Sequence, residues 1–221
     1  MAVTPMPRRR SLRSRPLDIL LAVSLCAVAA SVVQQSAVLM ASDWLATSSR
    51  YEVARWAELG KEFDEAEWEH ARQQLERALA LTPEDAALHD SMSQLHAVKA
   101  QSLWNANGGT GSPEVTDAYR KAVASLEKSV EIRPTNALSW ANLALMRYTV
   151  GTEAETLFAT WEEAARLGPR EQVVENVLVT MLGSMPMMTE DMVEWGDARR
   201  PGLRAFLEAQ AEPAAPISSK P

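Results

Sequence analysis

The sequence predicts an all-α protein in which one apolar N-terminal helix precedes a short array of helical hairpins. The stretch from Ile19 to Val33 carries no charge, which is typical of a membrane helix. From residue 42 onward, apolar residues recur every three or four positions, as on one face of a helix. Pro83, Pro134 and Pro169 each close such a run, because a helix does not continue through proline.

The composition narrows the possible functions. The chain has 221 residues and a formal net charge of −7, and an acidic chain has no general affinity for nucleic-acid phosphates. A single cysteine, Cys26, excludes an intramolecular disulfide framework and a multi-cysteine metal site. The length suits one modest domain with appendages. We expect no cofactor and no bound metal.

The N-terminal 41 residues predict a signal-anchor. Residues 1–16 are basic, and residues 17–41 are long enough, at about 1.5 Å per residue, to cross a hydrocarbon core of about 30 Å. Arginines before a single span favour a cytoplasmic N-terminus in the bacterial inner membrane, with residues 42–210 in the periplasm. The alternative is a signal peptide cleaved after Val28-Ala29-Ala30, but the apolar residues beyond Ala30 favour an uncleaved anchor.

One spacing recurs before each of the three prolines. Side chains at 12, 8, 5 and 2 residues before the proline share one helix face, and a small residue at the third place lets another helix approach closely. These residues are Ala71, Leu75, Ala78 and Leu81; Ala122, Leu126, Ser129 and Ile132; and Leu157, Trp161, Ala164 and Leu167. Further upstream, two segments share a Trp-x-x-Leu-Gly/Ala pattern: Trp56, Leu59, Gly60 and Phe63, and then Trp140, Leu143 and Ala144.

This combination resembles the tetratricopeptide repeat, a helix–turn–helix unit of about 34 residues. The resemblance implies that these side chains and the three prolines form a repeat core, in which Gly60 and Ala144 let helix backbones touch. Repeats are expected over residues 53–85, 86–136 and 137–170, with a loop insertion at 105–113, a capping segment at 171–210 and a disordered tail at 211–221. Five methionines of the cap either pack inside it or offer an apolar partner surface. They are Met181, Met185, Met187, Met188 and Met192.

A narrower likeness is carried by Arg133-Pro134, by residues 140–145 (Trp-Ala-Asn-Leu-Ala-Leu) and by Leu167-Gly168-Pro169, with Glu171 and Val174 beyond. Over roughly residues 45–185 the chain resembles the VpsP family of polysaccharide biosynthesis proteins, and the N-terminal anchor agrees. The resemblance implies a membrane-anchored protein with tetratricopeptide-like helices that is associated with exopolysaccharide and biofilm-matrix gene clusters. It implies no established catalytic residue.

No residue pattern predicts catalysis. His89 and His96 are seven residues apart, which separates them by about 10 Å along a helix, too far for one metal ion without other ligands. The loop at 105–113 lacks the Lys-Ser/Thr of a phosphate-binding loop, and no carboxylate pair stands out as acid and base. We therefore expect that the protein is not an enzyme.

The tetratricopeptide pattern also predicts a partner-binding groove, lined by the first helix of each pair. Carried onto this chain, the pattern assigns to the groove Lys61, Asp64, Glu65, Asp90, Gln94, Leu145 and Tyr148. Such a groove is acidic at one end and apolar at the other, which suits a partner segment with a basic residue beside an aliphatic or aromatic one. Residues 52–95 carry a net charge of −7 and form either a solvated surface or a docking face for a basic partner.

The sequence thus predicts a membrane-anchored interaction or scaffold protein that supports exopolysaccharide biosynthesis or export by binding proteins of an envelope assembly complex. The alternative is a periplasmic accessory protein of quality control or of a secretion complex. A third, weaker hypothesis is a glycan-binding or glycan-modifying protein that uses exposed tryptophans. No pattern specifies an oligomeric state.

Overall fold

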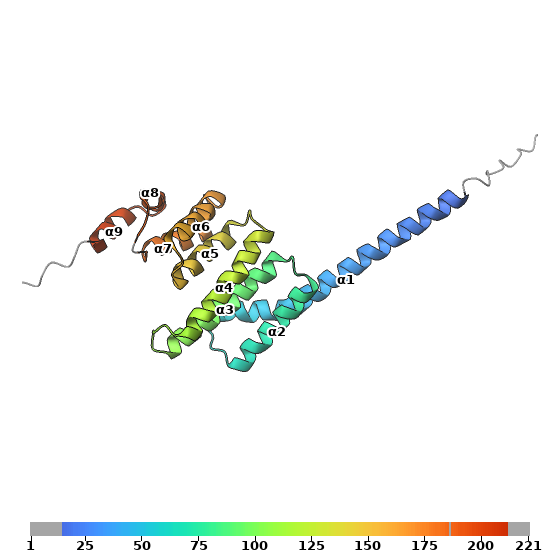
Figure 1. Cartoon of the computed structure of the whole chain (residues 1–221), viewed down its shortest axis with the longest axis horizontal. Helices are drawn as coiled ribbons and strands as arrows, with labels where there is room; N and C mark the ends of the chain where they lie inside the picture. Colours follow the sequence, from blue (N-terminus) through green and yellow to red (C-terminus); the bar gives the residue numbers. More distant parts are fainter. Residues whose placement is uncertain (1–14, 186, 212–221) are drawn as a thin grey trace, which may run out of the picture.

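The computed structural model describes residues 15–185 and 187–211, and within these ranges every regular element is an α-helix (Figure 1). The predicted all-α class is confirmed for this part of the chain. Residues 1–14 of the basic segment 1–16, and residues 212–221 of the expected disordered tail 211–221, lie outside the described residues. The helices are α1 (Arg15–Leu59), α2 (Glu65–Leu81), α3 (Ala86–Ala106), α4 (Pro113–Ile132), α5 (Ala137–Val150), α6 (Ala154–Leu167), α7 (Gln172–Leu182), α8 (Glu190–Arg199) and α9 (Leu203–Ala211).

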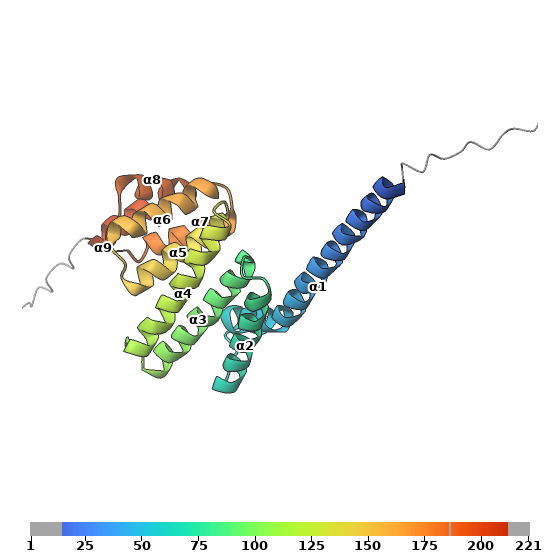
Figure 2. The ribbon, with the colours of Figure 1, turned by 45° about the vertical axis from the view of Figure 1, so that its right-hand side comes forward.

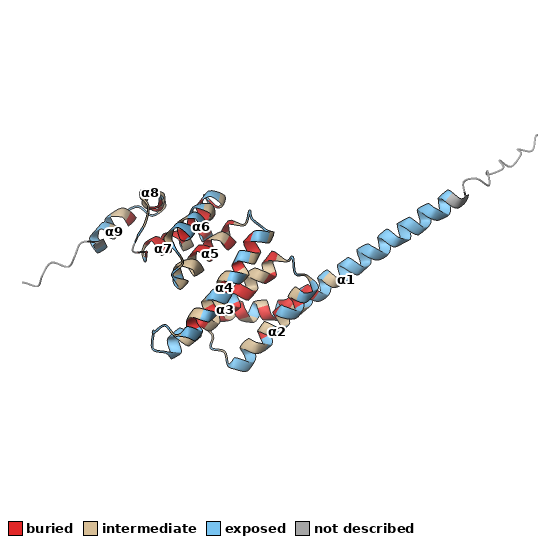
Figure 3. Cartoon of the chain, viewed as in Figure 1, coloured by how far each residue is buried: buried red, intermediate tan, exposed pale blue. Residues whose placement is uncertain are grey.

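α1 is a single helix of 45 residues whose first half projects away from the helical body (Figure 1). Residues 17–41 are mostly apolar and almost entirely exposed (Figure 3), so they form a candidate membrane span by length and composition. Burial begins at Ser42, whose hydroxyl donates to the Ala78 carbonyl at 3.1 Å. The predicted span ended at Ala41, but the helix continues to Leu59. Residues 42–59 contain neither proline nor glycine, so no residue of this segment interrupts the helix.

The end of α1 corrects the expected first repeat. The pattern placed Trp56, Leu59, Gly60 and Phe63 along one helix, but α1 ends at Leu59, and Gly60 has a φ of +60°. Glycine adopts this left-handed conformation readily because it has no Cβ. A Cβ built on Gly60 would meet no atom within 4 Å, so this glycine turns the chain and does not permit a close helix contact. Leu59 is 73% exposed and does not belong to a core.

Short turns connect most of the following helices, and some of these helices begin with a side-chain cap. Asp64 starts α2 with a capping box, in which its side chain accepts from the Glu67 amide at 2.7 Å and the Glu67 side chain accepts from the Asp64 amide at 3.2 Å. α2, α4 and α6 each end two residues before a proline, as the spacing predicted. The prolines themselves lie exposed in the turns and not in a core: they are Pro83, Pro134 and Pro169.

α3 and α4 form a long hairpin. Its loop covers residues 107–112, which is shorter than the expected insertion at 105–113, because α3 extends to Ala106 and α4 begins at Pro113. Ser112 caps α4 by accepting from the Val115 amide at 3.3 Å. The indole of Trp104 lies against the loop glycines, so this glycine-rich segment is partly covered by its own hairpin.

The buried side chains form two main clusters and a smaller one. α1, α2 and α3 enclose the first cluster, while α5 to α9 enclose the second. α4 and α5 meet in the small cluster around Leu126 and Leu143. Of the residues expected in the repeat core, those buried are Trp56, Ala71, Ala78, Ala122, Leu126, Leu143, Ala144, Trp161 and Ala164. Phe63 and Trp140 are half-buried, and the Trp140 indole donates to the Pro134 carbonyl at 2.8 Å.

α7, α8 and α9 cover the end of the α5–α6 pair (Figure 2). Trp161 of α6 packs edge-on against Trp195 of α8, with ring centroids 5.0 Å apart. Three of the five methionines are buried here: Met181, Met185 and Met192. Met187 is 64% exposed, so packing explains most of the methionine cluster and leaves one member at the surface.

Helix α5 and the turn before α7 approach closely at Gly168. A Cβ on Gly168 would lie 2.7 Å from the Ala137 Cβ and 3.1 Å from a Val174 methyl group. We therefore expect Gly168→Ala to lower the free energy of unfolding by about 1–3 kcal/mol through overpacking. Gly183→Ala is the matched control, because Gly183 has an ordinary helical φ of −64° and its Cβ would meet only ordinary contacts. Equal stability of the two variants in chemical denaturation would contradict the close approach.

His96 lies where α2, α3 and α4 meet, with its ring centroid 5.9 Å from that of Trp68. Burial, reinforced by the nearby cations Lys121 and Arg72, lowers the pKa of His96 to about 4, against the opposing effect of Asp117. The unfolded chain has an ordinary histidine pKa of about 6.5. Between these two values the unfolded chain binds a proton that the folded chain does not, so stability falls as the pH falls.

We expect the free energy of unfolding to decrease between pH 6.5 and pH 5 in the wild-type chain, and to decrease less in His96→Gln over the same window. Denaturant unfolding of the full chain in detergent micelles measures this dependence. The matched control is His70→Gln, which replaces an exposed histidine of α2 and shows whether removing any histidine changes the slope. Identical slopes for His96→Gln and the wild type would show that His96 does not titrate in this way.

Candidate functional site

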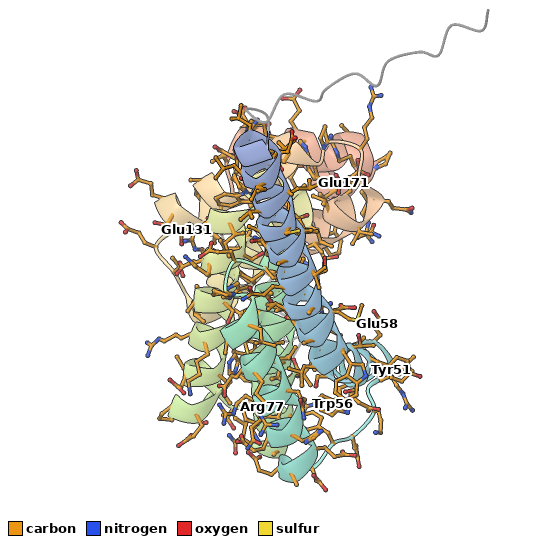
Figure 4. The ribbon with its side chains drawn as sticks, turned by 90° about the vertical axis from the view of Figure 1, so that its right-hand side faces the viewer. Tyr51, Trp56, Glu58, Arg77, Glu131 and Glu171 are labelled. Atoms are coloured by element: carbon orange, nitrogen blue, oxygen red, sulfur yellow. The ribbon has the colours of Figure 1, made fainter. Side chains whose placement is uncertain are left out.

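One hollow lies between the end of α1, α3, and the facing sides of α4 and α5. It has a volume of about 610 Å³. Trp56 and Phe63 form one wall, Tyr119 and Met146 stand opposite, and α3 supplies the strip between them. The Trp56 and Phe63 rings lie 4.8 Å apart, so the turn after α1 is held against the helix. Figure 4 shows Trp56 facing the body of the domain and Tyr51 facing outward.

A second hollow of about 370 Å³ continues the first along α3 toward the N-terminal end of that helix. The two share Gln94, Ala97 and Met146 in their walls. We call the combined depression the α3 groove. Alternate helices, α1, α3 and α5, supply most of its lining, with contributions from α4. The groove is therefore a feature of tertiary packing and not of any single hairpin.

Side-chain amides follow the length of the groove. Gln94, Gln101 and Asn105 stand seven and four residues apart on α3, which corresponds to about 10.5 Å and 6 Å along one helix face. The Gln101 amide donates to the Asn105 side-chain oxygen at 3.0 Å. Asn142 of α5 faces the same space. Each amide carries both donors and an acceptor, so the wall can pair with a ligand that presents alternating donors and acceptors.

Three charged residues line the groove near its ends: Lys61 and Asp90 are already paired, whereas Glu62, beside Lys61, forms no ion pair among the described residues. Lys61 lies 3.3 Å from a Glu52 oxygen and 3.7 Å from a Glu67 oxygen. At the other end, Asp90 accepts from the Ser139 hydroxyl at 2.9 Å and from Arg133 at 3.1 Å. These contacts tie α3 to the α4–α5 turn and to α5 itself. The middle of the groove is consequently lined by uncharged groups.

The structure brings together three of the seven predicted groove residues. Lys61, Asp90 and Gln94 line the α3 groove. Asp64 and Glu65 do not, because the helix that holds Trp56 ends at Leu59, before it reaches them: Asp64 caps α2, and Glu65, on α2, pairs with Lys99 of α3.

The two residues predicted from the third repeat are also displaced. Leu145 and Tyr148 pack against the second core cluster, and the Tyr148 hydroxyl donates to the Ser184 carbonyl. They therefore face the cap, and the groove side of α5 instead presents Leu138, Asn142 and Met146. The physical reason is that α5 contacts α7 through the face that the repeat pattern assigned to the ligand.

Sequence reasoning missed the amides Gln101, Asn105 and Asn142, and also Tyr119 and Met146. The spacing of Gln94, Gln101 and Asn105 was visible in the sequence as one uncharged stripe of α3. The contributions of α4 and α5 were not, because they depend on how the α3–α4 hairpin is placed beside α5. The sequence therefore indicated the α3 wall of the groove but not the walls formed by α4 and α5.

The histidines considered as ligands lie apart. His89 hydrogen-bonds with the Pro83 carbonyl at 2.9 Å, whereas His96 packs on Trp68 away from the groove. Within residues 15–185 and 187–211, no group of three or more His, Cys, Asp or Glu side chains is arranged to hold a metal ion. No protein-family model matches the chain, and no curated protein matches its sequence.

Trp56 provides a test of the groove wall. Its side chain is 5% exposed, and its indole N–H has no hydrogen-bond acceptor among the described residues. We expect Trp56→Phe to change the free energy of unfolding by less than about 1 kcal/mol, because losing an unpaired buried donor offsets the lost contact area. Trp56→Ala should cost about 3–5 kcal/mol by opening a cavity. Equal losses in both variants, measured by chemical denaturation, would indicate that the indole N–H is satisfied.

Proposed function

We propose that the protein is a membrane-anchored, non-enzymatic interaction protein whose α3 groove binds a protein partner in support of exopolysaccharide biosynthesis or export. The observation that carries this proposal is the groove itself, lined by apolar and amide side chains from alternate helices. One of those helices, α1, is also the candidate membrane span. The partner site and the anchor therefore share a single element.

The helix arrangement supports a tetratricopeptide-like solenoid. Each helix contacts the next one along the chain, and contacts also join α1 to α3 and α5 to α7, as expected when hairpins stack side by side. The recurring small residues Ala78 and Ala164 are fully buried. The arrangement departs from the repeat pattern in that α3 and α5 are not in comparable contact, that the helix of Trp56 ends before Phe63, and that the prolines are exposed. The groove in this arrangement corresponds to the surface formed by the first helix of each pair.

The resemblance to the VpsP family supports the link to polysaccharide assembly. It includes the anchor and most of the segment between α1 and α7. The alternative function, a periplasmic accessory of quality control or secretion, uses the same anchor and groove with a different partner. Co-purification from native membranes separates the two: polysaccharide polymerase or export proteins favour the first function, and translocation or division proteins favour the second.

The proposal includes a topology with the arginine-rich N-terminus in the cytoplasm and the helical domain in the periplasm, in the bacterial inner membrane. A reporter enzyme that is active only in the periplasm, fused after Pro221, should be active. Activity of a cytoplasmic reporter at the same position would reverse the topology. A mature protein that lacks the first 30 residues would show that the segment is a cleaved signal peptide and not an anchor.

Partner binding can be tested by filling the groove with charge. The double variant Gln94→Arg/Gln101→Arg places two cations on an uncharged wall, and both positions are exposed, so the fold should be retained. We expect it to lower partner capture from native membranes about tenfold or more. The matched control, Gln73→Arg on the exposed side of α2, should capture normally. Normal capture by the double variant, with unchanged helicity and melting, would exclude the groove as the contact.

A further inference from the structure

The α3 groove has a defined direction relative to the candidate membrane span because α1 is unbroken. Trp56, in the groove wall, lies fifteen residues beyond Ala41, which is about 22 Å along the helix axis. No glycine or proline interrupts residues 42–59. A continuous helix of this length is a rigid connection, so the span sets the orientation of the groove.

α3 runs in the same general direction as α1 (Figures 1 and 2). The C-terminal end of α2 lies beside Ser42 of α1, where the domain begins: the hydroxyls of Thr82 and Ser42 are 2.6 Å apart. α3 then begins beside Arg50 of α1, which lies 3.8 Å from Asp85. The Asp90 end of the groove is consequently nearer the span, and the Asn105 end is farther from it.

The groove walls are complementary to an uncharged, extended polypeptide. The distance from Asp90 to Asn105 along α3 is about 22 Å, the length of six or seven residues of extended chain at about 3.4 Å each. The amide spacings of about 6 Å and 10.5 Å approximate two and three residues of such a chain. Lys61 and Asp90 are already paired, and Glu62, the remaining charged residue of the lining, lies beside Lys61 and not in the middle of the groove. A charged residue in the middle of the bound segment would therefore lose hydration without gaining a partner there.

Trp56, the largest aromatic side chain of the groove, is poorly placed to stack on a sugar ring. Sugar rings stack on exposed aromatic faces, but Trp56 is only 5% exposed and its ring is packed against Phe63. The remaining apolar lining includes aliphatic side chains such as Ala97, Val98 and Met146. These side chains accommodate small apolar residues of a peptide.

From this geometry we propose that the α3 groove binds the juxtamembrane segment of an integral membrane protein: an extended, uncharged stretch of six or seven residues directly outside that protein's own membrane span. The proposal rests on the function above, in which α1 crosses the membrane and the groove binds protein. It adds the class of partner and the direction of binding. A segment that leaves the bilayer beside α1 enters the groove at the Asp90 end and follows α3 outward.

The first experiment places a photoreactive benzoyl-phenylalanine at Gln94 or Gln101 of the full chain in native membranes and maps the crosslinked peptides. The control position is Gln73 on α2. We expect adducts from both groove positions, within about ten residues of a membrane span of the partner, with Gln94 reacting closer to the span than Gln101. The control position should give no such adduct. Adducts in a soluble protein, or far from any span, would overturn the juxtamembrane assignment while leaving a protein-binding groove.

The second experiment inserts a flexible Gly-Ser linker of six residues between Ala41 and Ser42, which leaves the contacts of Ser42 within its own domain. The linker separates the domain from the span, so the groove no longer has a fixed orientation relative to the membrane. If binding depends on that orientation, the effective concentration of the partner segment falls, and the adduct yield should be about fivefold lower. An unchanged yield would overturn the fixed direction but not the groove. No protein adduct from either groove position in the uninterrupted chain, or adducts with a glycan instead, would overturn both proposals.

Discussion

The continuity of α1 is the constraint on which the rest of the structure depends. One helix supplies the exposed apolar rod, a wall of the first core cluster and one side of the α3 groove. Because hydrogen bonds along a helix satisfy its backbone without outside partners, such a helix can pass from an apolar phase into a folded domain without a break. The domain begins directly at Ser42, where the end of α2 first covers the helix.

The groove exists because α3 is held at a distance from α5 along most of its length. Asp90 joins the N-terminal part of α3 to Arg133 and Ser139, while farther along α3 the amides of Gln94 and Gln101 face open space. The hairpin partner of α3, α4, packs closely against it and closes the floor. A shallow depression with a neutral wall results, although the chain as a whole carries a charge of −7.

Several of the acidic residues form local ion pairs outside the groove. Arg72 bridges Glu69 and Glu76 on α2, and the hydrogen bond from Arg72 lowers the pKa of the Glu69 carboxyl to about 2. Lys99 of α3 reaches Glu65 of α2. These exposed pairs contribute little stability individually. They occupy carboxylates of residues 52–95, the acidic segment whose charge suggested a docking face for a basic partner. Few unpaired carboxylates therefore remain near the groove.

The sequence by itself determined the helical class, the apolar N-terminal stretch and the positions of the three turns before α3, α5 and α7. Periodicity, charge-free length and proline placement are local properties, and they act within a few residues. It also indicated a stripe of amides on α3 once helical spacing is applied, although only Gln94 was assigned to a groove.

Only the tertiary structure decided which helix faces meet. The left-handed Gly60 ended α1 before Phe63 and moved Asp64 and Glu65 onto α2. Leu145 and Tyr148 pack against the capping helices and not in the groove, because the last hairpin of a solenoid must have its apolar face covered by a cap. A repeat pattern shows which residues of a helix are apolar or small. Which face of the helix is buried depends on packing partners that are distant in sequence. Those partners are determined only when the whole chain folds.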